Sequence, residues 1–326
     1  MKIAIPDDYQ DCVRHLQCFS TLADHEVTIY NDNVKDVSAL AARFADAQAI
    51  VLTRERTRIT AELLDRLPQL RVISQTGKLA GHVDLAACTQ RGIAVLEGSG
   101  TGAATAELTW ALLLASRRNV VAEVNRLHSG LWQGSVGQQL QGQRLGVWSY
   151  GRIGKQVANY GKAFGMKVWA WGRAGSMAQA QADGVEVAPS KQAFFAQSDV
   201  ISLHVRLNAD TAGMVTAADL AGMKPSALFV NTSRAELVAP GALTQALQQG
   251  RPGFAAVDVY EDEPVLGAAH PLLQLPNALC TPHLGFVEQD NYERYFGLAF
   301  ENINHFAAGR TTGLVNSDYV LSRPAP

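Results

Sequence analysis

Residues 145–173 constrain the fold of this chain more than any other stretch. They begin with a short apolar run, Gly146–Trp148, which predicts a buried strand. Gly151 and Gly154 follow and predict a turn into a helix, and a further apolar run, Lys167–Trp171, predicts a second strand. Strand, glycine turn, helix and strand in this order form the βαβ unit that usually binds the pyrophosphate of a dinucleotide.

The two glycines of this turn have a physical role. The backbone comes close to phosphate oxygens there, and a Cβ would block the approach. The unpaired N–H groups and the dipole at the helix N-terminus attract the pyrophosphate. The motif G-x-G-x-x-G would place its first glycine at position 149, where this chain has Ser149. A serine fits if its φ is negative, so we expect the turn to persist with a slightly changed shape.

The end of the second strand also departs from the usual pattern. An acidic residue normally stands there and binds the ribose 2′-hydroxyl, but this chain has Gly172 followed by Arg173. Loss of the carboxylate removes repulsion toward a 2′-phosphate, and an arginine can pair with that group. We therefore expect NADP(H) as the preferred cofactor, with NAD(H) possible. The alternative is that Arg173 is only a solvated loop charge.

Length, charge and cysteine content limit the classes of protein to which the chain can belong. At 326 residues, the chain is long for one core, so two domains are expected. A net charge of −2 without basic blocks argues against nucleic-acid binding. No apolar run approaches membrane-spanning length, and the first one is too short for a signal peptide. The four cysteines form no Cys-x-x-Cys pair and the histidines show no metal-ligand spacing, so we expect a cytoplasmic protein without metal.

Strands and helices alternate along the first hundred residues and predict a parallel α/β layer. The glycine-rich stretch 97–102 is then either a second phosphate loop or a crossing between domains; we favour the crossing, because no strand with a ribose-binding residue follows. We expect a substrate (catalytic) domain of residues 1–100 plus 286–326 and a dinucleotide-binding domain of residues 101–285, with cofactor and substrate in the cleft between them. Both are expected to be doubly wound, the Rossmann-type domain being inserted in a flavodoxin-like one.

One long helix is expected from Thr105 to His128. It carries more apolar surface than a helix can bury against a single sheet, so we expect a homodimer that buries the remainder. Its apolar residues include Leu108, Trp110, Leu112, Leu113, Val120, Val121, Val124 and Leu127.

Three polar residues follow predicted strands of the central part, namely Arg234, Glu263 and His283. Ligands of open α/β sheets bind at these strand ends. An arginine can hold the carboxylate and carbonyl oxygens of an α-keto acid, a histidine can donate a proton, and a nearby carboxylate stabilises the imidazolium. A single Arg, Glu or His in a loop is more often structural than catalytic, so the interpretation depends on the joint placement of the three residues downstream of a nucleotide fold. Asp258 could simply cap a helix, and we expect His204 to be a core histidine in the middle of a strand.

Taken together, these motifs resemble the D-isomer-specific 2-hydroxyacid dehydrogenase family over nearly the whole chain. The resemblance implies hydride transfer between a nicotinamide cofactor and a 2-keto or D-2-hydroxy acid, with Arg234, Glu263 and His283 as the catalytic set. It rests on the segments Thr105–Leu114, Gly151–Gly154, Asn231–Arg234, Val257–Pro264 and Thr281–Gly285.

The resemblance also implies the binding residues. The substrate carboxylate falls on the loop Gly77, Lys78 and Leu79, where the family usually has two glycines separated by one residue. Lys78 is either a charge contact to an anionic substrate or a solvated side chain. Arg206 stands where the family usually has proline, on the adenosine side, and Asp258 matches the contact to the nicotinamide carboxamide. The implied cofactor contacts are Ser149, Gly151, Arg152, Ile153, Gly154, Gly172, Arg173, Arg206, Thr232 and Asp258.

Two other functions remain open at this stage. One is oxidation of a small anion such as formate or phosphite. The other is a catalytically weak, nucleotide-sensing binding protein of the corepressor type. The partners expected in the main interpretation are a small 2-keto or 2-hydroxy acid and a second copy of the chain, with no nucleic acid and no membrane.

Overall fold

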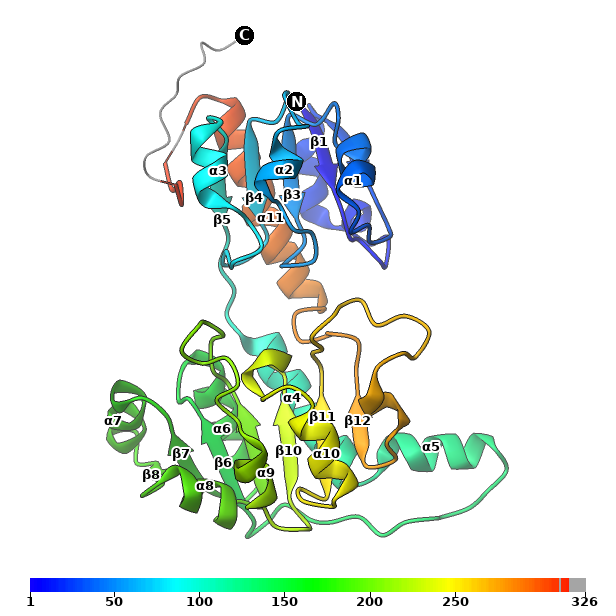
Figure 1. Cartoon of the computed structure of the whole chain (residues 1–326), viewed down its shortest axis with the longest axis vertical. Helices are drawn as coiled ribbons and strands as arrows, with labels where there is room; N and C mark the ends of the chain where they lie inside the picture. The colour runs from blue at the N-terminus through cyan, green and yellow to red at the C-terminus, as the bar shows by residue number, and fades with distance from the viewer. Residues whose placement is uncertain (311, 317–326) are drawn as a thin grey trace. The chain divides into compact units, whose positions relative to one another are not determined.

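The computed structural model of the protein describes residues 1–310 and 312–316. The chain divides into two compact units, each built around its own parallel sheet (Figure 1). The first unit contains Met1–Gly100 and the chain from Glu288 onward, and the second contains Thr101–Val287. The chain passes from the first unit to the second at Gly100, within the glycine-rich stretch 97–102.

The sheet of the first unit has five parallel strands in the order β2-β1-β3-β4-β5, which is the flavodoxin-like doubly wound order. The central strands β3 and β4 are buried at every residue, because helices cover both faces of a parallel sheet. The strands are β1 Lys2–Ile5, β2 Glu26–Ile29, β3 Ala49–Leu52, β4 Val72–Gln75 and β5 Ala94–Glu97. The helices are α1 Val37–Arg43, α2 Ala61–Leu64, α3 Leu85–Gln90 and α11 Gln289–Ala307, with 3-10 turns η1 Val13–His15 and η2 Gln17–Leu22.

The first unit is completed by residues from the far end of the sequence. Helix α11 packs against β4 and η2 and buries a row of large apolar side chains there. Beyond α11, Leu314 pairs with Leu96 of β5, and the Asn316 side chain accepts a hydrogen bond from the Val95 amide at 3.0 Å. The buried row of α11 is Tyr292, Phe296, Phe300, Ile303 and Phe306.

The sheet of the second unit has seven parallel strands in the order β12-β11-β10-β9-β6-β7-β8. Counted from β6, this is the Rossmann order 3-2-1-4-5-6 with one further strand, and the order reverses between β6 and β9. The strands are β6 Arg144–Trp148, β7 Lys167–Trp171, β8 Glu186–Val187, β9 Val200–Leu203, β10 Leu228–Asn231, β11 Phe254–Val257 and β12 Ala278–Cys280. The helices are α4 Ala103–Arg117, α5 Val120–His128, α6 Arg152–Ala163, α7 Ala174–Ala182, α8 Lys191–Gln197, α9 Ala217–Ala221 and α10 Ala242–Gln248, with 3-10 turns η3 Ala235–Leu237 and η4 Pro271–Gln274.

The prediction of one continuous helix from Thr105 to His128 is wrong. The chain leaves α4 at Arg117 and starts α5 at Val120, and Asn119 between them has a left-handed φ of 54°. Asparagine tolerates this conformation better than most residues, so an apolar period that runs through the junction does not reveal it. The two helices also differ in environment, since α4 is packed into the unit whereas α5 has no buried residue.

Candidate active site

Neighbouring strands of the second unit each carry one of the three predicted catalytic residues just beyond their carboxyl ends. Arg234 follows β10, Glu263 follows β11 and His283 follows β12. The three strands are parallel and adjacent in the sheet, so their carboxyl ends lie along one edge. The topology therefore brings to one edge three side chains that are spread over about fifty residues of the sequence.

Glu263 and His283 form a direct pair. The Oε2 atom of Glu263 lies 2.6 Å from Nδ1 of His283, and its Oε1 accepts the backbone N–H of Tyr260 at 2.9 Å. Burial raises the pKa of Glu263, but the hydrogen bond and charge of His283, the Tyr260 amide and the charge of Arg234 together bring it below its usual range. Glu263 is therefore ionised at neutral pH. Because Nδ1 faces this carboxylate, Nε2 of His283 is left for a ligand.

A buried carboxylate holds the turn that carries His283, whose φ is 52°. Asp258 is fully buried, and its Oδ1 accepts the Thr281 hydroxyl at 2.6 Å and the Leu284 amide at 2.7 Å. Its Oδ2 accepts the Gly285 amide at 2.8 Å. Burial raises the pKa of Asp258, while these hydrogen bonds act in the opposite direction. The alternative that Asp258 caps a helix is wrong, because its partners belong to the 281–285 turn.

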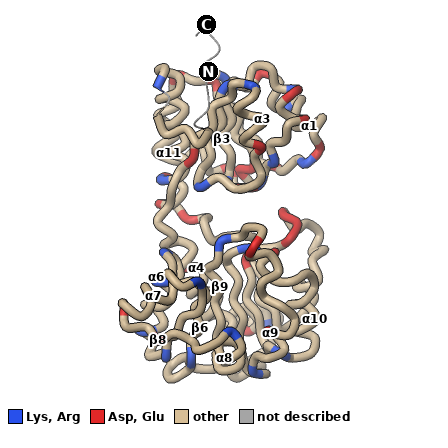
Figure 2. Tube along the Cα trace, turned by 60° about the vertical axis from the view of Figure 1, so that its left-hand side comes forward, with Lys and Arg blue, Asp and Glu red and all other residues tan. Residues whose placement is uncertain are grey.

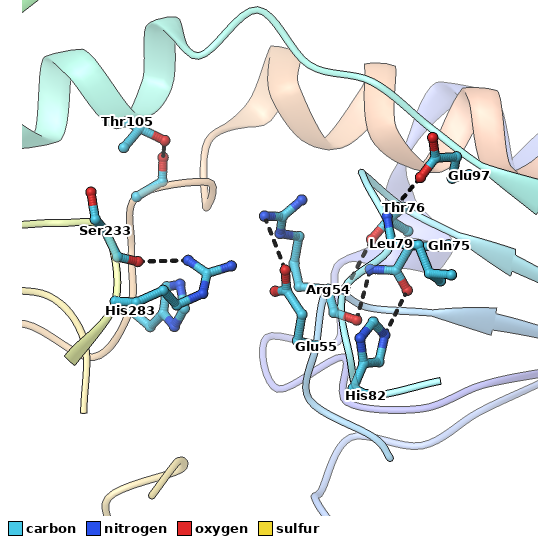
Figure 3. A network of polar contacts seen from close by, with 12 residues as sticks. Arg54, Glu55, Gln75, Thr76, Leu79, His82, Glu97, Thr105, Ser233 and His283 are labelled. Atoms are coloured by element: carbon cyan, nitrogen blue, oxygen red, sulfur yellow. Dashed lines mark hydrogen bonds and ion pairs between the residues drawn. The ribbon is translucent and has the colours of Figure 1, made fainter. Parts of the chain in front are cut away.

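Helix α4 supports the same turn from another side. The hydroxyl of Thr105 donates to the carbonyl of Gly285 at 2.7 Å (Figure 3). One turn further along α4, the hydroxyls of Thr109 and Thr232 are 2.7 Å apart and buried. The side chain of Thr232, a predicted cofactor contact, is thus bonded to α4. Sequence reasoning missed both α4 threonines, although they lie in a segment that carries the family resemblance.

Local hydrogen bonds direct Arg234. Its guanidinium donates to the carbonyl of Ser233 at 2.6 Å (Figure 3). The Asn231 side chain bridges the same turn, since its amide nitrogen donates to the Arg234 carbonyl at 2.8 Å and its oxygen accepts the Ser233 amide at 3.0 Å. Arg234 is half-buried and acts electrostatically on Glu263. The site therefore combines a guanidinium, an imidazole and an ionised carboxylate.

The glycine turn between β6 and α6 is formed, but not in the expected conformation. Ser149 has a φ of 76°, so the expectation of a negative φ is wrong. Its amide donates to the Trp171 carbonyl at 2.7 Å, which ties the turn to β7. A Cβ on Gly154 would lie 2.2 Å from the Ser149 carbonyl oxygen, so only glycine is accommodated there. A Cβ on Gly151 would meet only the Ser149 hydroxyl, at 3.9 Å, so the backbone before the first turn of α6 is not crowded.

This geometry fits a dinucleotide pyrophosphate. Gly151 lies at the N-terminus of a twelve-residue helix, whose first residues are the predicted contacts Arg152 and Ile153. The junction of β7 and α7 lies beside the turn, because the Ser176 hydroxyl accepts the Tyr150 amide at 2.6 Å. A Cβ on Gly172 would come within 3.3 Å of that hydroxyl, and Arg173 immediately precedes α7. Sequence reasoning missed Ser176. The feature that could have identified it is a hydroxyl side chain in the first turn of the helix that follows the second strand.

His204 and Arg206 follow strand β9. The expectation that His204 lies in the middle of a strand is wrong, because β9 ends at Leu203. The His204 amide donates to the Trp148 carbonyl at 2.9 Å, and its Nε2 lies 2.9 Å from the Ser202 hydroxyl. Burial lowers the pKa of His204 to about 3, so this imidazole stays neutral. Arg206 is exposed.

The predicted substrate loop lies in the first unit, after β4. Leu79 is buried in the core of that unit, and its amide donates to Oε2 of Glu97 at 2.8 Å (Figure 3). The Lys78 ammonium is paired with the other oxygen of Glu97. A Cβ on Gly77 would lie 2.0 Å from the guanidinium of Arg54, so that side chain packs directly on the Gly77 backbone. Sequence reasoning missed Glu97 and Arg54, which lie outside the loop in the sequence but contact it.

Two further observations concern the parts of the chain that are described. No group of three or more His, Cys, Asp and Glu side chains in them is placed to hold a metal ion, and none of their helices is long and apolar enough to cross a membrane. Acidic and basic residues are interspersed along both units (Figure 2).

Comparison with known proteins gives the family. Residues 110–285 match the model for the NAD binding domain of D-isomer specific 2-hydroxyacid dehydrogenases. A glyoxylate reductase from Aeropyrum pernix is 36% identical over 293 residues, which covers 86% of each chain. A crystal structure from Ralstonia solanacearum, provisionally assigned as a D-3-phosphoglycerate dehydrogenase, is 52% identical with a TM-score of 0.96, covering 100% of this chain and 98% of that one. A phosphoglycerate oxidoreductase from Vibrio cholerae is 50% identical with a TM-score of 0.93, covering 95% and 99%.

The chain belongs to the D-isomer specific 2-hydroxyacid dehydrogenase family. It is an NAD(P)-dependent oxidoreductase that transfers a hydride between a nicotinamide cofactor and a 2-keto or 2-hydroxy acid. The predicted fold class, two doubly wound parallel-sheet units, is confirmed.

Proposed function

We propose that this enzyme uses NADPH to reduce a small 2-keto acid to its D-2-hydroxy acid, with Arg234, Glu263 and His283 as the catalytic residues. The observation that carries the proposal is the 2.6 Å pair between Glu263 and His283 at the strand ends that also hold Arg234. The imidazole is oriented by a carboxylate on Nδ1, which is the arrangement that a general acid acting through Nε2 requires.

Each residue has a defined step in the reduction. Arg234 binds the substrate carboxylate and carbonyl oxygens and withdraws charge from the carbonyl. The nicotinamide, when bound, supplies the hydride to the carbonyl carbon. His283 gives the Nε2 proton to the oxygen that becomes the hydroxyl, and the neutral imidazole is reprotonated from solvent. Glu263 stabilises the imidazolium before transfer, and Asp258 keeps the turn of His283 in place.

The cofactor contacts are part of the same proposal. Gly151, Arg152, Ile153 and Gly154 would hold the pyrophosphate at the α6 N-terminus, beside the Ser149 turn. For the adenosine ribose, Gly172 offers no carboxylate to repel a 2′-phosphate and Arg173 supplies a cation, with Arg206 as a second cation on that side. Thr232 and Asp258 would lie on the nicotinamide side, where Asp258 uses capacity left beyond its three hydrogen bonds.

Further parts of the proposal concern the whole protein. The first unit would be the substrate domain, binding the substrate carboxylate at the loop Gly77–Leu79, and the second the dinucleotide-binding domain. Because the Leu79 amide is already bonded to Glu97, Gly77 and Lys78 are left as the amide donors. We also propose a homodimer, now through α5 rather than one long helix, and a cytoplasmic location in keeping with four free cysteines.

The test is turnover of purified enzyme with NADPH and with NADH against glyoxylate, hydroxypyruvate, pyruvate and larger keto acids. We expect turnover with at least one of them and a higher kcat/KM with NADPH. His283→Ala should lower kcat by about 10²–10⁴-fold, because it removes the proton donor. Its Kd for NADPH should remain nearly unchanged.

Three results would contradict the proposal. Unimpaired turnover by His283→Ala removes His283 from the chemistry, and a preference for NADH removes the argument from Gly172 and Arg173. Turnover of formate or phosphite in place of every keto acid points to small-anion oxidation. No turnover at all, combined with nucleotide-dependent oligomerisation, points to a nucleotide-sensing binding protein.

A further inference from the structure

Glu97 places a negative charge in the loop that we propose for an anionic substrate. It is the last residue of β5 and stands opposite Gln75, the last residue of β4. Its side chain is only 22% exposed. A carboxylate at this place would repel a substrate carboxylate and needs a counter-charge, because partly buried charges are screened little by solvent.

Lys78 supplies that counter-charge from within the loop. Its ammonium is paired with Oε1 of Glu97, while Oε2 of the same carboxylate accepts the Leu79 amide at 2.8 Å. Lys78 is 67% exposed, so the pair is reachable from solvent on the lysine side. One carboxylate therefore holds two successive residues of the loop, one through the backbone and one through an ion pair.

The rest of the loop is fixed independently of this pair. The Gly98 amide donates to the carbonyls of Gln75 and Gly77 at 3.0 Å each, and the Thr76 hydroxyl accepts the Arg54 amide at 3.0 Å. The side chain of Leu79 anchors the end of the loop in the core. Removal of the Lys78 charge should therefore change the electrostatics of the loop more than its shape.

We propose that Glu97 and Lys78 form a charge-compensated clamp that determines the affinity of the loop for an anionic substrate. Glu97 shapes the loop through the Leu79 amide, and Lys78 cancels the charge of Glu97 so that a substrate carboxylate can approach. Lys78 then acts on the substrate only through Glu97. This inference rests on the proposed role of the loop in substrate binding.

The two substitutions combine into a test that separates this mechanism from direct binding of substrate by Lys78. Lys78→Met leaves Glu97 unneutralised and should raise KM for the keto acid about three- to tenfold at low salt, with less effect at high salt. Glu97→Gln keeps an oxygen for the Leu79 amide but leaves the Lys78 charge unpaired, so its KM should not rise above that of the wild type and should fall at low salt. The double variant should return to within about twofold of the wild-type KM, since neither charge remains.

The other outcomes each overturn the proposal. If Lys78 contacts the substrate directly, the double variant keeps the high KM of Lys78→Met. If Lys78 is only solvated, Lys78→Met has no effect. The control is Lys2→Met, which removes an equally charged lysine from an exposed pair with Asp46 at the opposite end of the sheet and should leave KM unchanged.

A second measurement does not depend on catalysis. Hydrogen exchange of the peptide that contains Leu79 should be faster in Glu97→Ala, which lacks an acceptor, than in Glu97→Gln. Equal exchange in the two variants would show that Glu97 does not hold the loop. Absence of turnover in the wild type would refute the proposed function, whereas the exchange result would still decide whether the clamp exists.

Discussion

The protonation states of Glu263 and His204 depend on the groups in direct contact with their side chains. Glu263 stays ionised because its two oxygens receive the His283 imidazole and a backbone amide. His204 is half-buried where β6 and β9 meet, and it stays neutral because its imidazole is removed from water and bonded to a hydroxyl rather than a carboxylate. Burial without a carboxylate partner thus keeps the imidazole of His204 from taking up a second ring proton.

The neutral state of His204 predicts a pH dependence of stability. Its pKa is about 3 in the folded chain, against about 6.5 when unfolded, so below pH 6.5 the unfolded state binds a proton that the folded state does not. Stability should fall as the pH drops from about 6.5 toward 3. At pH 5 the share from His204 should be about 1–2 kcal/mol.

Urea unfolding followed by tryptophan fluorescence measures this effect, because all five tryptophans lie in the second unit. His204→Gln cannot take up a proton, so the loss of stability between pH 7.5 and pH 5 should be smaller in the variant than in the wild type. Equal losses would mean that His204 is accessible to protons in the folded chain.

The position of a residue was predictable where a strand end alone determines it, whereas the catalytic roles of these residues stay predictions. Arg234, Glu263 and His283 could be found because each follows a short apolar strand, and parallel pairing then brings them to one edge. The conformation of Ser149 could not be found in this way. Its positive φ accompanies a hydrogen bond from its amide to Trp171, twenty-two residues further along the chain.

At the scale of elements, the junction of β7 and α7 is the part of the fold that we propose for the adenosine end of the cofactor. Gly172, Arg173 and Ser176 lie within one turn, and the Ser176 hydroxyl joins this turn to the glycine turn through the Tyr150 amide. The junction therefore has a defined shape before any ligand binds, which favours discrimination between closely related nucleotides.

Substitution of Arg173 tests this junction. Arg173→Gln should raise KM for NADPH about tenfold and leave KM for NADH nearly unchanged, because only a 2′-phosphate gains a charge-assisted hydrogen bond from the guanidinium. Steady-state kinetics with both nucleotides measure the ratio. Lys162→Gln, which removes an exposed positive charge near the end of α6, is the matched control. Equal losses with both nucleotides would contradict the role of Arg173.

Element boundaries were predictable only where the local sequence specifies them. The Thr60 side chain accepts the Leu63 amide and starts α2, as a threonine before an apolar run indicates. The break between α4 and α5 was missed because its cause is the left-handed conformation of Asn119, which leaves the apolar period intact. The hydrogen bond from Thr105 to the Gly285 carbonyl could not be predicted either, since it joins residues 180 positions apart in the sequence.

At the scale of the whole molecule, α5 and the segment after it carry most of the large apolar side chains that are exposed in the described part of the second unit. Leu127 is 58% exposed, Trp132 74% and Val136 96%. The segment is held to α5, because Arg126 donates to the Trp132 carbonyl and Glu123 accepts the Gly134 amide. Ordered apolar surface of this kind marks an interface between proteins.

Size-exclusion chromatography with light scattering measures the mass of the protein in solution and tests the proposed homodimer. The wild type should have twice the 35.0 kDa mass of one chain. Val124→Asp combined with Leu127→Asp should shift it toward the monomer, since burial of two carboxylates opposes association. Leu273→Asp, on an exposed leucine of η4, should remain dimeric. A wild type that elutes as a monomer would contradict the dimer.

The return of α11 to the first unit has a consequence for how the chain is made. The strands of the first sheet are synthesised long before α11, the helix that covers one face of it. The buried residues Phe296, Phe300 and Ile303 of α11 follow nearly two hundred residues of the second unit in the sequence. The central unit, continuous in sequence, can fold during translation, while the nascent sheet keeps an uncovered apolar face until α11 has been synthesised. That interval is when the newborn polypeptide is most exposed to aggregation and most dependent on chaperones.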